Sequence, residues 1–248
     1  MSTPSYPPPR DLLKDKRVLV TAAAGTGIGF ATAKRCVEEG ARVIISDRHA
    51  RRLAQAAADL GVESVVCDVT NEAHVQAMFE AAEPVDVLIN NAGLGGYARL
   101  VDMTDAQWAQ VLDVTLTGTM RCMRAALKCM GPRGAGVIVN NASVLGWRAQ
   151  EGQSHYAAAK AGVMALTRCA AMEAAEVGVR VNAVAPSLAM HPFLSKVTPP
   201  GLLETLCQQE AFGRAAEPWE IANVIVFLAS DLSTYMTGEI VSVSSQRA

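Results

Sequence analysis

Short runs rich in valine and isoleucine recur along the whole chain and constrain its fold more than any other feature. The runs are nearly continuous in apolar character, as strands that are covered on both faces of a sheet are. Helical patterns separate most of them, and this alternation is typical of a parallel sheet with helices on both sides. The runs occupy residues 17–21, 41–46, 62–69, 85–93, 136–143, 179–186 and 239–245. The sequence therefore predicts an α/β fold with a doubly wound parallel sheet of about seven strands.

The chain shows no break in composition that would divide it into two domains, and 248 residues are enough for one large α/β domain. Its start, "MSTPSYPPPRDLLK", is rich in proline and predicts a flexible N-terminal arm over residues 1–14. Such an arm either stays disordered or lies across a neighbouring surface. Residues 15–248 form the domain. Within it, we expect the irregular stretch 187–213 to be a substrate loop, since long loops in compact domains are usually functional.

Composition excludes several classes of function. Hydrophobic residues make up 50% of the chain and charged residues 19%, which suits a packed core and not a disordered protein. The net charge of −2 gives no reason to expect a nucleic-acid or membrane partner, and no apolar run approaches the roughly 18 residues of a membrane span. The six cysteines are scattered, which predicts reduced thiols in the cytoplasm. The four histidines have no ligand spacing, so we expect no metal.

The segment "VLVTAAAGTGIG" consists of a strand, a turn of small residues and the start of a helix near Gly27. Small residues let the backbone approach a pyrophosphate, and a helix N-terminus offers free N–H groups and the positive end of its dipole. The turn is not a clean Gly-x-Gly-x-x-Gly, and a tight turn without a ligand would have the same composition. The candidate cofactor-binding residues here are Thr21, Ala23, Gly25, Gly27, Ile28 and Gly29.

Two carboxylates favour a nicotinamide dinucleotide. Asp47 closes the second predicted strand, where a carboxylate can bind the 2′-hydroxyl of the adenosine ribose. Asp68 closes the third strand, near the expected adenine, although either residue could instead form an Asx turn or a helix cap. The charge of Asp47 would repel a 2′-phosphate, which favours NAD, whereas Arg48 would attract one and leaves NADP possible.

The order and spacing of several motifs resemble the classical short-chain dehydrogenase/reductase family across nearly the whole chain. The motifs are "TAAAGTGIG" (21–29), "CDVT" (67–70), "NNAG" (90–93), Ser143, "YAAAK" (156–160), "VRVNAVAP" (179–186) and "FGRAAEPWEIANVIVFLASDLSTYMTGE" (212–239). The resemblance implies a single Rossmann-fold domain, a nicotinamide cofactor and hydride transfer between an alcohol and a carbonyl group.

The resemblance also implies site residues. The implied catalytic residues are Ser143, Tyr156, Lys160 and, in place of the family's usual asparagine, Thr115. Further cofactor-binding residues are Val69, Asn91, Ala92, Gly93, Tyr156, Lys160 and Pro186. Because Thr115 lacks an amide, a proton relay built on asparagine would be rearranged.

Tyr156 and Lys160 are one helical turn apart and therefore point to the same side of a helix. Ser143 ends a strand, at the edge of the sheet where ligands of such folds bind. A phenol accepts the proton of an alcohol only if its pKa falls from about 10, and lowering it by roughly three units needs about 4 kcal/mol. We expect the Lys160 ammonium, at about 4 Å and an effective dielectric constant near 20, to supply that much.

Other departures from the family's pattern concern the ends of the substrate loop and of the chain. "APS" at 185–187 replaces the usual Ala-Pro-Gly, and "SSQ" at 244–246 replaces a terminal Asp-Gly-Gly. Met190 or His191 stands where a threonine often contacts the carboxamide of the cofactor.

The candidate pocket wall combines apolar and basic residues, which suits a bulky hydrophobic substrate or one with an anionic tail. It includes Leu145, Trp147, Arg148, Gln153, His155, Leu188, Phe193 and Lys196. The local motifs resemble a subgroup of bacterial dehydrogenases that oxidise indane-propionyl-CoA remnants of steroid rings. The alternatives are a 3-oxoacyl reductase and a non-catalytic relative that binds dinucleotide.

Small and apolar residues over 104–130 and 156–176 could pack against copies of themselves. The family resemblance favours a homotetramer, with a homodimer as the alternative.

Overall fold

All seven valine- and isoleucine-rich runs form strands of one sheet, in the order β3-β2-β1-β4-β5-β6-β7. Every neighbouring pair is parallel, so the predicted doubly wound sheet is confirmed. The computed structural model describes residues 2–190 and 201–245. The strands are β1 (Arg17–Thr21), β2 (Arg42–Asp47), β3 (Glu63–Val66), β4 (Val87–Asn90), β5 (Gly136–Asn141), β6 (Val179–Pro186) and β7 (Ile240–Val243).

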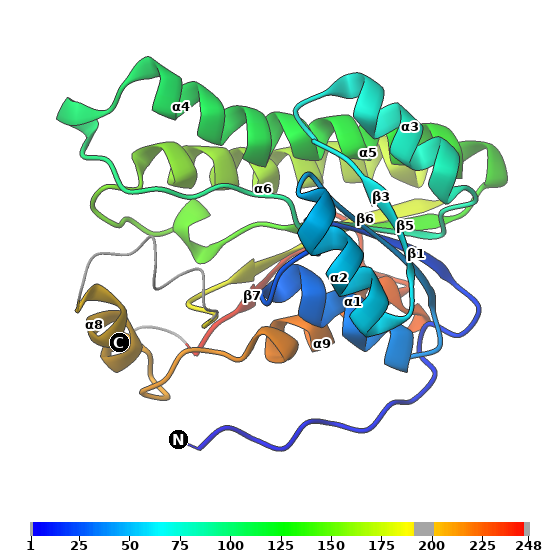
Figure 1. The fold of residues 1–248 in the computed structure, drawn as a ribbon, viewed down its shortest axis with the longest axis horizontal. Helices are drawn as coiled ribbons and strands as arrows, with labels where there is room; N and C mark the ends of the chain where they lie inside the picture. The colour runs from blue at the N-terminus through cyan, green and yellow to red at the C-terminus, as the bar shows by residue number, and fades with distance from the viewer. Residues whose placement is uncertain (1, 191–200, 246–248) are drawn as a thin grey trace.

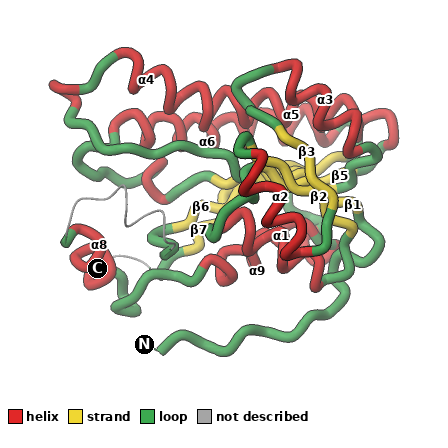
Figure 2. Tube along the Cα trace, viewed as in Figure 1, coloured by secondary structure: helices red, strands yellow, loops and turns green. Residues whose placement is uncertain are grey.

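Helices cover both faces of this sheet (Figures 1 and 2). One face carries α1 (Ile28–Glu38), α2 (Ala50–Leu60) and α9 (Pro218–Ala229). The other carries α3 (Glu72–Ala82), α4 (Asp105–Leu112), α5 (Gly118–Met130) and α6 (Ser154–Ala175). A short α8 (Leu202–Gln209) lies within the predicted substrate loop, 187–213. Single 3-10 turns span Leu100–Asp102, Gly131–Arg133, Val144–Gly146 and Asp231–Ser233.

The order of the strands reverses between β1 and β4, because the chain builds outward to β3 first and then returns to continue on the other side. Val18 of β1 pairs with Val43 of β2 on one side and Val87 of β4 on the other. The crevice at the carboxyl ends of the strands, where such a reversal occurs, is the place where doubly wound folds bind their ligands. The fold therefore determines where the site is.

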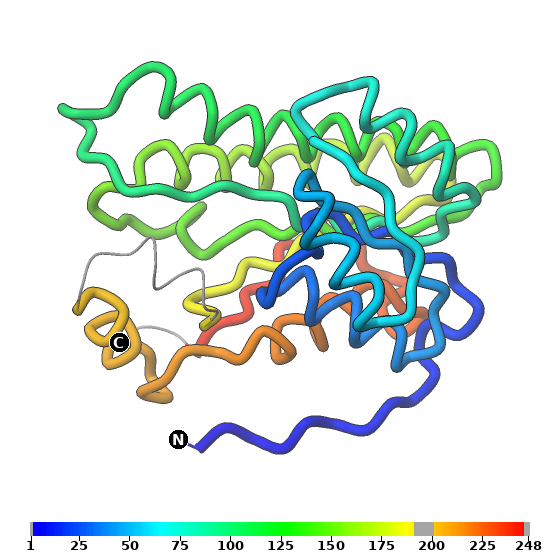
Figure 3. Tube along the Cα trace, in the orientation of Figure 1, coloured from blue at the N-terminus to red at the C-terminus, as the bar shows by residue number. Residues whose placement is uncertain are grey.

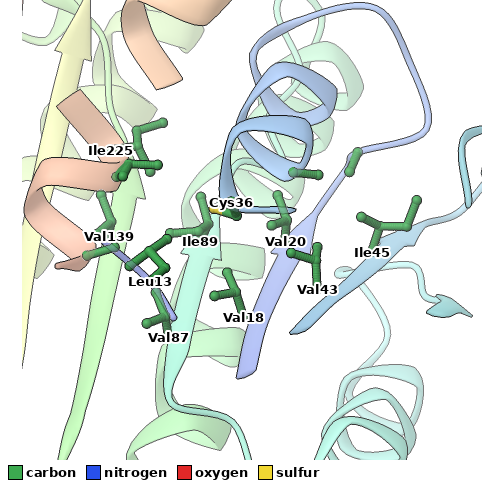
Figure 4. Packing of buried hydrophobic residues seen from close by; sticks show 14 of the residues in the cluster. Leu13, Val18, Val20, Cys36, Val43, Ile45, Val87, Ile89, Val139 and Ile225 are labelled. Atoms are coloured by element: carbon green, nitrogen blue, oxygen red, sulfur yellow. The ribbon is translucent and has the colours of Figure 1, made fainter. Parts of the chain in front are cut away.

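The core consists of a separate apolar cluster on each side of the sheet. Figure 4 shows part of the cluster beneath α1 and α9, where Val20, Ile89 and Val139 from three central strands face Cys36 and Ile225 from the helices. The second cluster joins the opposite face of the same strands to α3, α5 and α6. The edge strand β3 differs from the prediction, since most of its residues are exposed and it ends before Cys67.

The N-terminal arm runs along the outside of α1 and α9 (blue in Figure 3). The Tyr6 ring packs edge-on against Trp219 of α9, with 5.3 Å between the ring centroids. Of the two arrangements that the sequence left open, the described residues of the arm have the second, in which it lies across a neighbouring surface. The predicted boundary between arm and domain at residue 14 needs a correction, because Leu13 is fully buried in the core.

A buried ion pair at the C-terminal end of α1 holds this arm in place. Arg35 and Glu39 are 2.5 Å apart and buried. Arg35 donates hydrogen bonds to the carbonyl groups of Pro7 and Pro8, while Glu39 accepts from the backbone N–H groups of residues 10 and 12. Buried charges need such partners to offset the cost of removing them from water.

Candidate active site

The turn between β1 and α1 is packed against the end of β4. A Cβ atom on Gly29 would lie 2.4 Å from Nδ2 of Asn91 and 2.6 Å from the carbonyl oxygen of Ala22, so only glycine fits there. Asn91 donates to the carbonyl groups of Thr21 and Ala22 at 3.2 and 3.0 Å. The buried Thr21 hydroxyl in turn accepts from the backbone N–H groups of Asn91 and Ala92. The Thr21 and Asn91 side chains therefore build the turn, and the Ala23 side chain is buried in the core.

The mouth of this turn is open, and its geometry fits a pyrophosphate. Gly27 is the N-cap of α1 and provides no side-chain hydrogen bond to the N–H groups of the first turn. A Cβ atom on Gly25 would meet no atom within 4 Å, and Gly25 is exposed. Backbone N–H groups at a helix N-terminus that are not capped by a side chain are suited to bind phosphate oxygens.

Asp47 closes β2, as predicted, whereas Asp68 lies two residues beyond the end of the neighbouring strand β3. One Asp47 oxygen accepts from the His49 N–H at 2.9 Å and the other from the Ala24 N–H at 3.4 Å, which leaves acceptor capacity beside the turn. Burial alone would raise the pKa of Asp68, but hydrogen bonds from Thr70 hold it below its usual value. The side chain of Arg48 is exposed, and Val69 is buried.

Ser143, Tyr156 and Lys160 meet at the carboxyl ends of β4 and β5. The Ser143 hydroxyl forms a hydrogen bond with Tyr156. Nζ of Lys160 lies 5.6 Å from the centre of the Tyr156 ring and donates to the carbonyl oxygen of Asn141 at 2.5 Å. Lys160 is almost entirely buried, with 2% of its surface exposed. The structure thus brings the three residues together, as their spacing in the sequence predicted.

The ionisation of this group differs from the prediction. Burial raises the pKa of Tyr156 above its usual value, and the hydrogen bond from Ser143 offsets only part of that rise. Burial also lowers the pKa of Lys160 to about 8. The expectation that Lys160 makes Tyr156 acidic is therefore wrong for the protein alone. The surroundings disfavour both the phenolate and the ammonium because both are removed from water.

Thr115 lies in a π turn, Asp113–Thr117, that joins α4 and α5 into one helical segment. Its hydroxyl accepts from the N–H of Leu94 at 3.0 Å and is 3.3 Å from the carbonyl oxygen of the same residue. A single hydroxyl thus contacts both backbone groups of Leu94. The backbone carbonyl of Thr115 accepts from Thr119, so this π turn, a feature often found at functional sites, is held from both sides.

The segment after β4 covers the group. A Cβ atom on Gly93 would lie 3.4 Å from Nζ of Lys160, and one on Gly95 would lie 3.8 Å from the Tyr156 ring. Gln153 donates to the carbonyl oxygen of Gly96 at 2.7 Å, which ties this segment to the start of α6. The glycines at 93 and 95 thus let the backbone approach both side chains closely.

Asn141 is a site residue that sequence reasoning missed. Its carbonyl oxygen holds Lys160, and its side chain donates to Oδ1 of Asn91 at 2.9 Å. It therefore connects the cofactor turn to the Tyr–Lys pair. The signal was present, since the asparagine pair of "VNNAS" at the end of β5 matches the pair of "NNAG" at the end of β4.

The residues expected in the pocket wall divide into three groups. Trp147 is half exposed, while Leu145, Arg148, Gln153 and Leu188 are partly buried. His155 is buried, and burial lowers its pKa. His191, Phe193 and Lys196 lie outside the described residues. Pro186 is buried at the end of β6.

The comparisons with known proteins agree with this geometry. A family model described as "Enoyl-(Acyl carrier protein) reductase" matches residues 22–245. The crystal structure of a short chain dehydrogenase from Mycobacterium smegmatis superposes with a TM-score of 0.87 at 58% identity, covering 100% of this chain and 99% of that one. The chain belongs to the short-chain dehydrogenase/reductase family. It is therefore an oxidoreductase that interconverts an alcohol and a ketone with a nicotinamide dinucleotide.

Two relatives with named substrates are similar to this short-chain dehydrogenase. One is the (5R,7aS)-5-hydroxy-7a-methyl-1-oxo-2,3,5,6,7,7a-hexahydro-1H-indene-carboxyl-CoA reductase of Mycobacterium tuberculosis, which is 61% identical over 95% of this chain and 94% of that protein. The other is the cis-4-hydroxycyclohexanecarboxylate dehydrogenase of Sinomonas cyclohexanicum, 41% identical over 92% of this chain and 95% of that protein.

Two further features are absent from the part of the chain that the structure describes. No helix there is long and apolar enough to cross a membrane. Within 2–190 and 201–245, no group of three or more His, Cys, Asp or Glu residues could hold a metal ion.

Proposed function

We propose that this short-chain dehydrogenase interconverts a ring hydroxyl and a ketone on a bulky cyclic acyl-CoA thioester and uses NAD. The observation that carries the chemistry is the convergence of Ser143, Tyr156 and Lys160 under the glycine-rich segment 93–96. The thioester is proposed from the named substrate of the relative that is 61% identical.

Tyr156 is the acid and base at the substrate oxygen. Its raised pKa keeps the phenol protonated at neutral pH, so the protein alone is prepared to donate a proton to a ketone. In the opposite direction the phenol must first lose its proton, so alcohol oxidation is expected to become faster as the pH rises. Ser143 donates a hydrogen bond to the same substrate oxygen and stabilises the charge that develops on it.

Lys160 connects this acid to the cofactor side of the site. Because its pKa is about 8, Lys160 exchanges a proton near neutral pH and can restore the protonation state of Tyr156. Its position between the carbonyl group of Asn141 and Gly93 also fits the binding of ribose hydroxyls. Thr115 holds Leu94 and thereby the covering segment.

The N–H groups at the start of α1 and the exposed Gly25 are suited to the pyrophosphate, while Asn91, Ala92 and Gly93 border the nicotinamide end. A nicotinamide dinucleotide held there would supply the hydride chemistry. Asp47, at the end of β2, would accept a hydrogen bond from the 2′-hydroxyl of the adenosine ribose, and its charge disfavours the 2′-phosphate of NADP. The exposed Arg48 beside it would instead favour NADP.

Exposed apolar side chains support a large ring system as the substrate. Tyr97, Trp147 and Met190 each expose between 38% and 52% of their surface. All three come from loops that follow the carboxyl ends of strands β4, β5 and β6, at the edge of the sheet where the Tyr–Lys pair lies. Burying them against a hydrophobic ring would be favourable.

A substrate panel with cofactor absorbance as the readout tests this proposal. The panel contains a hydroxy-hexahydroindene-carboxyl-CoA thioester, cis-4-hydroxycyclohexanecarboxylate, a 3-hydroxyacyl-CoA and a simple secondary alcohol, each with NAD and with NADP. We expect the largest kcat/KM for the indene thioester with NAD. Higher kcat/KM for the free cyclohexane acid would reject the thioester. A preference for the 3-hydroxyacyl compound with NADP would instead indicate a 3-oxoacyl reductase.

We also propose a homotetramer. Trp108 of α4 and Met172 of α6 are exposed, by 38% and 77%, although both belong to helices that pack on the sheet. A second copy that packs against these helices through a twofold axis would cover both residues. Light scattering that gives a monomer mass at all concentrations would reject this assembly. The six free cysteines support a reducing cytoplasm as its location.

A further inference from the structure

Two departures from the family's pattern meet at one buried carboxylate, that of Glu210. Ser187 stands where the family usually has glycine after Ala-Pro, and Ser245 lies in the "SSQ" that replaces Asp-Gly-Gly. The hydroxyl groups of Ser187 and Ser245 both donate to Oε2 of Glu210, at 3.4 and 2.9 Å. Glu210 is only 3% exposed. A glycine at position 187 or 245 would have no hydroxyl group to donate.

These three residues connect separate elements, α8 and the ends of β6 and β7. Figure 1 shows these elements at the carboxyl edge of the sheet. Glu210 is the C-cap of α8, Ser187 directly follows β6, and Ser245 follows β7. The N–H of Ser187 also donates to the carbonyl oxygen of Val243, so the two strand ends are already joined to each other. The carboxylate therefore joins α8 to a fixed platform.

Among the described residues of α8, few side chains are buried. Leu206 is the one residue between Leu202 and Gln209 that is buried, and the others are partly or fully exposed. A backbone pairing between Leu188, Met190 and Ala216 holds the two ends of the substrate loop together, but it does not reach α8. A charge-assisted hydrogen bond is roughly twice as strong as one between neutral groups, so Glu210 contributes much of what fixes this helix.

We propose that Glu210 is a positioning residue that holds α8 as a wall of the substrate pocket, with Ser187 and Ser245 as its matched partners. Its kinetic effect rests on the proposed function, because α8 belongs to the loop assigned to the substrate. Glu210 acts through α8 and affects the binding of substrate more than the chemical step.

The first test needs no substrate. Hydrogen exchange of the backbone amides of α8 is compared between the wild type, Glu210→Ala and the double variant Ser187→Ala/Ser245→Ala. We expect exchange in α8 to become about tenfold faster in both variants, because local opening costs less once the anchor is removed, and exchange in β5 to stay the same. Ser242→Ala is the matched control. Ser242 lies in β7, the strand that Ser245 follows, and its hydroxyl contacts Ser244 and not the Glu210 carboxylate. Unchanged exchange of α8 in Glu210→Ala would overturn the proposal.

Glu210→Gln keeps the shape of the side chain and serves if the alanine variant does not fold. It removes the charge but keeps an oxygen that can accept one hydroxyl group. Its α8 exchange is expected to lie between those of the wild type and the double serine variant, and a value equal to the wild type would contradict a role for the carboxylate.

The second test uses the indene-carboxyl-CoA thioester. We expect KM to rise about tenfold in Glu210→Ala while kcat stays within about threefold, which is the pattern of lost substrate binding. The affinity for NAD, measured by titration, should not change. A fall in kcat with KM unchanged would contradict the positioning role. If the wild type does not turn over the thioester, the proposed function fails, while the exchange result still decides the role of Glu210.

Discussion

The low pKa of the buried Lys160 should make the stability of the protein depend on pH, and this can be tested apart from catalysis. Lys160 is 2% exposed, and burial lowers its pKa from 10.5 to about 8. At 1.36 kcal/mol per pKa unit, that difference corresponds to about 3 kcal/mol. The free energy of unfolding is lower by this amount at any pH where Lys160 is charged in both the folded and the unfolded protein. The perturbation that isolates this effect is Lys160→Met, which removes the charge and keeps a long apolar side chain.

The sign follows from proton binding. Below pH 8 the folded and unfolded states both carry the proton, so the full penalty applies. Between about pH 8 and 10.5 the unfolded chain binds more protons than the folded protein, so the stability of the wild type rises with pH through this interval. We therefore expect the free energy of unfolding of the wild type to gain about 2–3 kcal/mol relative to Lys160→Met between pH 7 and pH 10.

Thermal or urea unfolding of both proteins at several pH values and equal protein concentration measures this difference. For a chain of this length it corresponds to a relative shift in Tm of roughly 5–10 °C. Lys34→Met is the control, because the hydrogen bond to Glu38 raises the pKa of this exposed lysine and it keeps its proton across the interval. A difference between wild type and Lys160→Met that does not change with pH would refute the low pKa of Lys160 and its part in proton exchange.

Five further substitutions test other parts of the site and the fold. Asp47→Ala should reduce the preference for NAD over NADP in kcat/KM, and an unchanged ratio would mean that another residue recognises the ribose. Gly29→Ala should lower the free energy of unfolding by about 1–3 kcal/mol through overpacking. Gly25→Ala should leave the stability unchanged and weaken NAD binding. Scanning calorimetry measures the first effect and titration calorimetry with NAD the second. Glu39→Ala should cost roughly 3–5 kcal/mol by leaving a buried charge without its partner. Glu63→Ala is the matched control, because Glu63 is exposed and lies 3.6 Å from Arg17; this change should lower the free energy of unfolding by less than about 1 kcal/mol. Equal losses of stability in Glu39→Ala and Glu63→Ala would contradict the role of the buried Arg35–Glu39 pair in holding the N-terminal arm.

Much of the fold could be predicted because the sheet is parallel and central strands are buried on both faces. Each such strand therefore appears in the sequence as a continuous apolar run, and the bounds of β1 and β6 agree with the runs at 17–21 and 179–186. The edge strand β3 was predicted too long, at 62–69. β3 lies at the edge of the sheet, so one of its sides faces solvent and not another strand. Cys67 and Asp68 belong to the turn that follows β3.

The site was predictable where its residues are close in sequence or follow strands. Tyr156 and Lys160 share one helical turn, and Ser143 follows β5. Their ionisation was not predictable, because the pKa of each group depends on burial that the sequence does not report. Contacts between distant segments were also missed: Glu210 lies 23 residues from Ser187 and 35 from Ser245.

We propose that Tyr156 transfers the proton at the substrate oxygen, with a bound nicotinamide dinucleotide supplying the hydride chemistry. The most direct measurement compares wild type and Tyr156→Phe with the indene-carboxyl-CoA thioester, following cofactor absorbance, together with NAD affinity by titration. We predict unchanged NAD affinity and a loss in kcat of about 10²–10⁴-fold, the usual contribution of a general acid or base. A kcat within a few fold of the wild type would contradict the account.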